Sequence, residues 1–232
     1  MSTPNQRSAD FVLVVDVTGS MQPCIDALKR NLSRFVSGLN SEQSRLTNWR
    51  GRVVGFRDFP ADASTWLEDN PFTSDFETLM RNLEVLRARG GGSDGPESLL
   101  DALHFVATAE SNDSNQVYSW RKHREASRVV IAFTDAKYHP NVTYSQSGRG
   151  TGIAGICELL RDKGIILHIF APDIPEYDVL SMVPKCEFHA LAKPAKQSLS
   201  ELSNNDRAFG QIMDSLVKSI STSASVQVSQ YE

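Results

Sequence analysis

The chain has 232 residues, 40% of them hydrophobic and 22% charged, which is typical of a soluble globular protein and fits one large α/β domain. Its formal net charge is −4 and it has no dense run of Lys and Arg, which argues against nucleic acid as a partner. No apolar stretch approaches the roughly 18 residues that span a bilayer, and the N-terminal MSTPNQRSAD lacks the apolar core of a signal peptide. We therefore expect a cytoplasmic protein without a membrane partner, and reduced rather than disulfide-bonded thiols at its 3 Cys.

Predicted strands and helices alternate along the chain. Apolar runs predict strands at residues 11–15, 52–56, 129–133, 165–170 and 187–190, with a short edge strand near 65–67. Apolar side chains at three- and four-residue intervals predict helices at about 23–39, 75–86, from Pro96 onwards, 153–163, 177–182 and 199–220. We expect one domain over residues 1–220, a polar tail over 221–232, a surface connection over 110–127 and a long functional loop over 136–152.

This alternation predicts an α/β fold: a doubly wound, mostly parallel, Rossmann-like central sheet with helices on both faces. Right-handed crossovers place the carboxyl ends of all parallel strands at one edge of such a sheet, where ligands bind. If the strand order is 3-2-1-4-5-6, the first and fourth strands are neighbours. Asp16 and Asp135 lie just past the ends of these two strands. We therefore expect the two side chains to lie close together.

Oxygen-bearing side chains recur just past the first strand, in the segment FVLVVDVTGSMQ. Asp16, Thr18 and Ser20 alternate there, and a glycine loop carrying Ser93 and Asp94 starts at the same predicted edge. Together with Asp135 these groups form an all-oxygen ligand set, which suits Mg²⁺ first, then Mn²⁺, with Ca²⁺ last. The alternative is that Thr18 and Ser20 cap the following helix while Asp135 is a solvated loop acid.

Here the chain resembles the von Willebrand factor type A (vWA) family. Asp16-x-Thr18-x-Ser20 is similar to that family's D-x-[ST]-x-S signature for the metal-ion-dependent adhesion site, and Phe133-Thr134-Asp135 resembles its late aspartate motif. The loop reads Gly92-Ser93-Asp94-Gly95-Pro96-Glu97, which is similar to a G-x-D-x-P-E variant and departs from the family's usual Gly-Gly-Thr. Asp94 or Ser93 would then take the place of the threonine.

The resemblance implies a metal-dependent adaptor within a larger intracellular assembly. A partner protein would complete the cation's shell with an Asp or Glu carboxylate, and the partner could belong to an AAA+ ATPase, a kinase, or a bacterial stress or defence system. One alternative is a Mg²⁺-dependent phosphatase, which would need a second acid where Thr18 stands. Another is a vWA-shaped scaffold whose metal site is degenerate. We expect no enzyme.

Other polar residues carry weaker signals. Asp58 follows the second strand and is interpreted either as an outer acid of the site or as a partner of Arg57. His139 is interpreted as a solvated loop residue, and His168, within an apolar strand, as a core residue rather than a ligand. Tyr138, Tyr144 and Arg149 in the long loop could contact a partner.

Overall fold

The computed structural model describes residues 7–44, 46–91, 95–109, 117–182, 185–192 and 194–229. Within these ranges the main sheet has six strands in the order β3-β2-β1-β5-β7-β8. Its strands are β1 (Ser8–Asp16), β2 (Asn48–Phe56), β3 (Leu67–Asp69), β5 (Ser127–Phe133), β7 (Ile165–Pro172) and β8 (Cys186–Leu191). Only β3 pairs antiparallel. Counted along the chain, this is the 3-2-1-4-5-6 order, so the doubly wound α/β prediction is confirmed.

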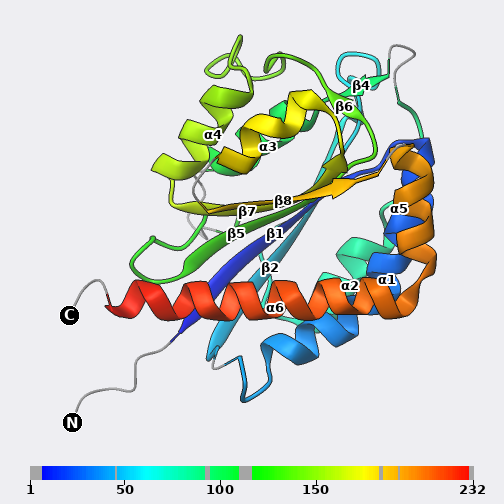
Figure 1. Cartoon of the computed structure of the whole chain (residues 1–232). Helices are drawn as coiled ribbons and strands as arrows, with labels where there is room; N and C mark the ends of the chain where they lie inside the picture. Colours follow the sequence, from blue (N-terminus) through cyan, green and yellow to red (C-terminus); the bar gives the residue numbers. More distant parts are fainter. Residues whose placement is uncertain are drawn as a thin grey trace.

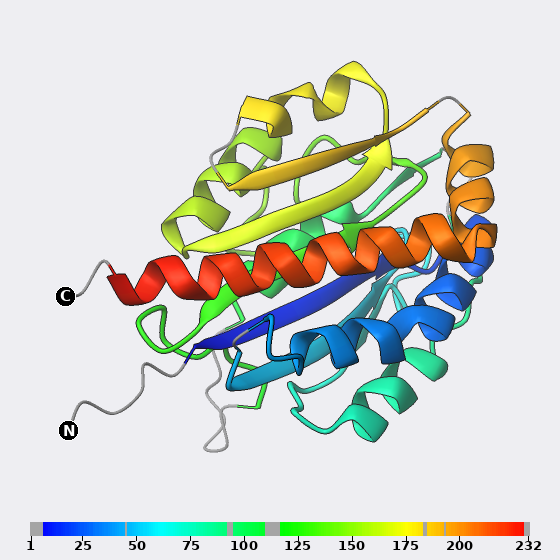
Figure 2. The same cartoon turned by 60° about the horizontal axis from the view of Figure 1, so that its bottom comes forward.

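Helices cover both faces of the sheet (Figures 1 and 2). Along β1, Phe11, Leu13 and Val15 pack into one core with helices on their side, whereas Val12 and Val14 pack into a second core on the other side. This follows from the alternation of side chains along a strand. The first face carries α1 (Gln22–Leu39), α2 (Phe76–Glu84), α5 (Ala195–Asn204) and α6 (Asp206–Ser229), and the second carries α3 (Leu99–Ala107), α4 (Ile153–Asp162) and the 3₁₀ segment η2 (Pro175–Met182).

The carboxyl ends of β1 and β5 lie side by side. Val15 is the register partner of Phe133, so the chain leaves both strands at the same height. The 3₁₀ turn η1 (Gly19–Met21) follows β1 and leads directly into α1. This arrangement brings the segment after residue 15 next to the segment after residue 133, as the sequence predicts.

The segment after the glycine loop differs from its prediction. Pro96 and Glu97 do not open a helix; they form β4 (Pro96–Glu97), which pairs in parallel with β6 (Lys137–Tyr138) in a separate small sheet. Helix α3 begins only at Leu99. A Pro-Glu pair favours the start of a helix, but here its pairing with the 136–152 loop determines the structure. No local sequence pattern indicates that pairing.

The C-terminal region also differs from its prediction. The single helix expected at 199–220 is two helices that meet at Asn205, whose φ and ψ of −101° and 86° are not helical. The Asn205 side chain accepts a hydrogen bond from the Ala208 amide at 3.0 Å and so caps α6. Helix α6 then continues to Ser229, so most of the segment predicted as a polar tail is helical. No helix in the described ranges is long and apolar enough to cross a membrane.

Candidate metal centre at the carboxyl edge of the sheet

Asp16 is fully buried at the end of β1 and is held by hydroxyl groups. Its Oδ1 accepts hydrogen bonds from the Thr18 amide at 2.9 Å and the Thr18 hydroxyl at 2.7 Å. Its Oδ2 accepts one from the Thr134 hydroxyl at 2.8 Å, across the β1–β5 boundary. Burial raises the pKa of Asp16 to about 6, although the hydrogen bonds from Thr18 and Thr134 oppose that shift. The carboxylate therefore orients two hydroxyl oxygens from beneath the site.

The structure does not support the helix-capping alternative for Thr18. This residue flanks η1 in an extended conformation but makes no side-chain cap hydrogen bond, and α1 begins without one as well. The Thr18 hydroxyl points back to Asp16 instead. Ser20 lies within η1 and lines the same cleft as Thr18.

Asp135 follows β5 and reaches the same place. It is 6% exposed, and its Oδ1 is a buried oxygen without a hydrogen-bond partner among the described residues. It also lies close enough to Asp16 to raise the pKa of that carboxyl by repulsion. Asp135 is thus a buried acid of the site, not the solvated loop acid of the alternative interpretation.

Glu97 is a site residue that the sequence did not single out. It is 6% exposed, and its Oε2 has no hydrogen-bond partner within the described part of the chain. Burial raises the pKa of Glu97 to about 9, and repulsion from Asp16, Asp58, Asp62 and Asp135 adds to the shift. The only sequence signal for Glu97 was its position in the G-x-D-x-P-E motif, because β4 is too short to show the alternation of a strand.

Two further acids, Asp58 and Asp62, lie near Glu97. The Oδ1 of Asp58 lies 2.6 Å from Nε2 of His139, and the His139 side chain is largely buried. The predicted pairing of Asp58 with Arg57 and the predicted solvated position of His139 are therefore both wrong. Arg57 pairs with Glu68 instead. Asp62 accepts a hydrogen bond from the Gly91 amide at 2.9 Å. Asp58 lies close enough to Glu97 to raise the pKa of that acid, and its role as an outer acid of a metal site stays a prediction.

Gly90 and Gly91, at the start of the glycine loop, pack tightly onto this edge. Gly91 has a φ of 100°, and a Cβ there would lie 3.3 Å from both Thr18 Cβ and Glu97 Oε1. Gly90 has a φ of 68°, and a Cβ there would lie 2.5 Å from Asp62 Oδ1. Ser93 and Asp94, the two loop residues predicted as alternative ligands, lie outside the described residues.

A cleft of about 780 Å³ opens above these groups. Two lysines, Lys137 and Lys196, stand on its wall, and Lys137 pairs with Glu176 at 2.6 Å. The oxygen-bearing and acidic groups of the wall are those of Thr18, Ser20, Glu97 and Asp135. Carboxylate and hydroxyl oxygens are the donors that Mg²⁺ and similar hard cations prefer, so the donor chemistry fits such an ion.

Comparison with known proteins agrees with this fold. Solved structures of the pilus adhesin SpaC from Lactobacillus rhamnosus GG and of proximal thread matrix protein 1 from the mussel byssus superpose with TM-scores of 0.56 and 0.57, at 13% and 16% identity. Both alignments cover 93% of this chain, and 31% and 47% of those chains respectively. At such identities they support the fold alone.

One curated relative aligns by sequence. It is the alpha-protein kinase vwkA of Dictyostelium discoideum, 28% identical over 138 residues, which are 60% of this chain and 20% of the relative. The chain therefore matches about a fifth of that protein's length. Residues 10–139, more than half of the 232-residue chain, match the family described as von Willebrand factor A domain. The chain belongs to the von Willebrand factor A domain family.

Proposed function

We propose that this chain is a metal-dependent protein-binding module. One observation carries the proposal: two buried carboxylate oxygens, Glu97 Oε2 and Asp135 Oδ1, have no hydrogen-bond partner in the described residues, and their side chains line one cleft with Thr18 and Ser20. Buried polar atoms normally have partners, so unpaired carboxylate oxygens at a cleft favour a ligand that supplies positive charge.

The electrostatics of the acids support a divalent cation. Two like charges about 4 Å apart repel by roughly 4 kcal/mol at an effective dielectric constant near 20. Burial is the main cause of the raised pKa values of Asp16 and Glu97, and repulsion from neighbouring acids adds to both shifts. We expect Thr18, Ser20 and Asp135 to hold Mg²⁺ or Mn²⁺, with Glu97 added to the set and Ser93 or Asp94 contributing from the loop.

Asp16 has a distinct role in this proposal. Its two oxygens accept from Thr18 and Thr134, so it supplies negative charge from below and turns the Thr18 hydroxyl so that a lone pair faces the cleft. A bound cation would offer a Lewis-acidic contact to an Asp or Glu carboxylate of a partner protein. The module therefore recognises a partner acid and, on this proposal, catalyses no reaction itself.

We infer the kind of partner from the chemistry of the cleft and from the name of the aligned relative. A protein that presents a carboxylate on a convex surface fits the cleft. Among the assemblies that vWA modules could join, a kinase-containing one has the most support, because the aligned relative is named an alpha-protein kinase. An AAA+ ATPase or a bacterial defence component has no comparable support from the relatives above. The proposed setting is intracellular, without nucleic acid or membrane as partner.

The experiment is a pull-down with the immobilised chain under matched conditions. Partners recovered in Mg²⁺ should be lost in EDTA and lost with Asp16→Ala, but kept with Glu158→Gln, a control acid on the exposed side of α4. Equal recovery in all four arms would reject the metal bridge. A thermal shift assay separates the degenerate-scaffold alternative, which predicts no stabilisation by Mg²⁺. Mg²⁺-dependent phosphoester turnover that Asp16→Ala abolishes would replace the binding role with the phosphatase alternative.

A further inference from the structure

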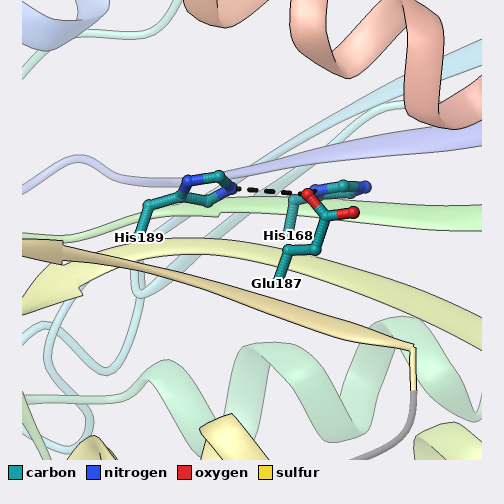
Figure 3. Close-up of side chains that lie close together, drawn as sticks. All are labelled: His168, Glu187 and His189. Carbon is teal, nitrogen blue, oxygen red and sulfur yellow. Dashed lines mark ion pairs between the residues drawn. The ribbon is translucent and has the colours of Figure 1, made fainter.

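Two histidines and a glutamate gather at the far side of the sheet, on β7 and the edge strand β8 (Figure 3). His168 is the register partner of Glu187, and His189 follows two residues later on β8, so all three side chains leave the sheet on the same face. This is the face that α6 covers, because Ser219 of α6 lies 3.0 Å from His168 Nε2. The cluster is therefore built by strand pairing and not by a flexible loop.

The distances among the three side chains suit a single ion. His168 Nδ1 lies 3.2 Å from Glu187 Oε2, and His189 Nε2 lies 4.0 Å from the same oxygen. One possible ligand atom from each residue lies within 4.8 Å of the others. Ligand atoms of a tetrahedral zinc site are about 3.3 Å apart, given metal–ligand bonds of roughly 2.0–2.2 Å. Small side-chain rotations of Glu187 and His189 would bring the set to that size.

The two nitrogens that face Glu187 have no hydrogen-bond partner in the described part of the chain. They are His168 Nδ1 and His189 Nε2, both buried. The contact of His168 with Glu187 meets the distance of an ion pair but not the geometry of a hydrogen bond. A buried imidazole nitrogen that carries no proton has a lone pair available for a metal.

The surrounding residues hold both rings in place. His168 Nε2 contacts the Ser219 hydroxyl, which can accept a hydrogen bond from Nε2–H; in that tautomer the lone pair is on Nδ1. The ring of His189 stacks on Phe170 with centroids 4.2 Å apart and planes 6° apart. Burial lowers the pKa of both histidines, and Glu187 opposes that shift. Neutral imidazoles are the form that binds metals.

We propose that His168, Glu187 and His189 form a second metal site, for a divalent transition metal and foremost Zn²⁺. Two imidazoles and one carboxylate suit Zn²⁺ rather than Mg²⁺. The Glu187 side chain is 54% exposed and that of His189 is 36% exposed, so water can reach a fourth position. The site would tie the edge strand β8 to β7. It departs from the interpretation of His168 as a core residue only.

This site is separate from the carboxyl-edge cleft in residues and in chemistry. None of its three residues lines that cleft. Cys186, one residue before Glu187, packs with the opposite core, so strand alternation keeps its thiol on the other face. The two sites can therefore be tested independently with different metals and different variants.

The test is calorimetric titration of Zn²⁺ into the whole chain carrying Asp16→Ala, which disables the first site. One Zn²⁺ should bind per chain, and the further change His189→Ala or Glu187→Gln should weaken binding at least about a hundredfold, since loss of an outer-shell partner alone costs 10–100-fold. His123→Ala, which removes a histidine outside the cluster, should leave Zn²⁺ binding unchanged. Circular dichroism of each variant checks that it folds. Unchanged binding in both cluster variants, or no Zn²⁺ binding in the Asp16→Ala chain, would overturn the proposal.

Absorption of the Co²⁺ form gives a second readout of the same site. Co²⁺ replacing Zn²⁺ should give the intense visible bands of a four-coordinate ion with nitrogen and oxygen ligands. His189→Ala should abolish those bands. A sulfur-to-cobalt charge-transfer band would place the ion on Cys157 or Cys186 and contradict the assignment.

Discussion

Strand β1 carries a fully buried aspartate near each end, and the two have different kinds of neighbour. Asp10, near the start, is held by two guanidinium groups, Arg50 at 2.6 Å and Arg121 at 2.7 Å. It also accepts a hydrogen bond from the Arg121 backbone amide at 2.8 Å. Its charge is fully compensated, as expected for a buried ion that serves only the fold.

Asp16, at the other end, has a different set of neighbours. In the described ranges it forms no ion pair with Lys or Arg. It accepts hydrogen bonds from the amide and hydroxyl of Thr18 and from the hydroxyl of Thr134. Two acids, Asp135 and Glu97, lie close enough to interact with its charge, and Lys137 on the wall of the cleft pairs with Glu176. The same strand thus neutralises one buried acid with two arginines and leaves the other without a cationic partner in the described ranges. We take this contrast as the mark of a ligand site at the second end.

The largest effect is expected for Asp10→Ala. Removing this acid leaves two partly buried arginines without their anion, and breaking a buried pair costs about 3–5 kcal/mol of unfolding free energy. Asp16→Ala should cost clearly less in metal-free protein, because the loss of hydrogen bonds is offset by relief of repulsion. Urea denaturation in EDTA measures both. Equal costs would contradict the distinction between the two acids.

Glu97→Gln should change stability in the opposite direction. In metal-free protein at pH 7.5, three units above the ordinary pKa of 4.5, the substitution should raise the free energy of unfolding by up to about 4 kcal/mol, since one pKa unit corresponds to about 1.4 kcal/mol. The same substitution should reduce the stabilisation that Mg²⁺ gives. Thermal unfolding with EDTA and with Mg²⁺ checks both signs. A Glu97→Gln chain that is less stable in EDTA would contradict a raised pKa for this buried acid.

The pH dependence follows from the same acids. The pKa of Glu97 is raised from 4.5 to about 9 and that of Asp16 from 3.8 to about 6, so between these values the folded chain binds protons that the unfolded chain has released. Their contribution to stability therefore falls as pH rises, by up to about 1.4 kcal/mol per pH unit for each group. Urea denaturation at pH 5.5, 7.0 and 8.5 in EDTA should show a steeper fall for wild type than for Glu97→Gln. Parallel slopes would contradict the assignment.

The smallest effect is expected for Thr134→Val. This change removes one hydrogen bond to Asp16 and keeps the side chain's shape, so it should cost about 1 kcal/mol of stability. It should also weaken Mg²⁺ binding by roughly tenfold, because Asp16 would be less firmly held. Calorimetry with Mg²⁺ checks the second effect, with Ser219→Ala on α6 as a control that should leave Mg²⁺ affinity unchanged.

The sequence predicted the sheet because its strands are long, apolar and followed by acids. The strand order and the meeting of Asp16 with the residues after β5 follow from general rules for parallel sheets. It missed Glu97, since β4 is two residues long and is defined by its pairing with β6, distant in sequence. It also missed the helix break at Asn205, where one residue leaves the helical conformation without any Pro or Gly to signal it.

The histidine cluster shows a second limit of sequence reasoning. His168 and Glu187 become neighbours only through the β7–β8 register, and a histidine in an apolar strand looks like any other core residue. Ser93 and Asp94, which the sequence proposed as alternative ligands, lie outside the described residues, so that choice stays a prediction.

The most direct measurement of the central claim is calorimetric titration of Mg²⁺ at pH 7.5 in two buffers that differ in ionisation enthalpy. Mg²⁺ binding should release about one proton, because the ion replaces the proton that Glu97 holds through its raised pKa. The affinity should fall sharply in Asp16→Ala. Absence of Mg²⁺ binding, or binding that releases no proton and is the same in Asp16→Ala, would contradict a metal centre built on these acids.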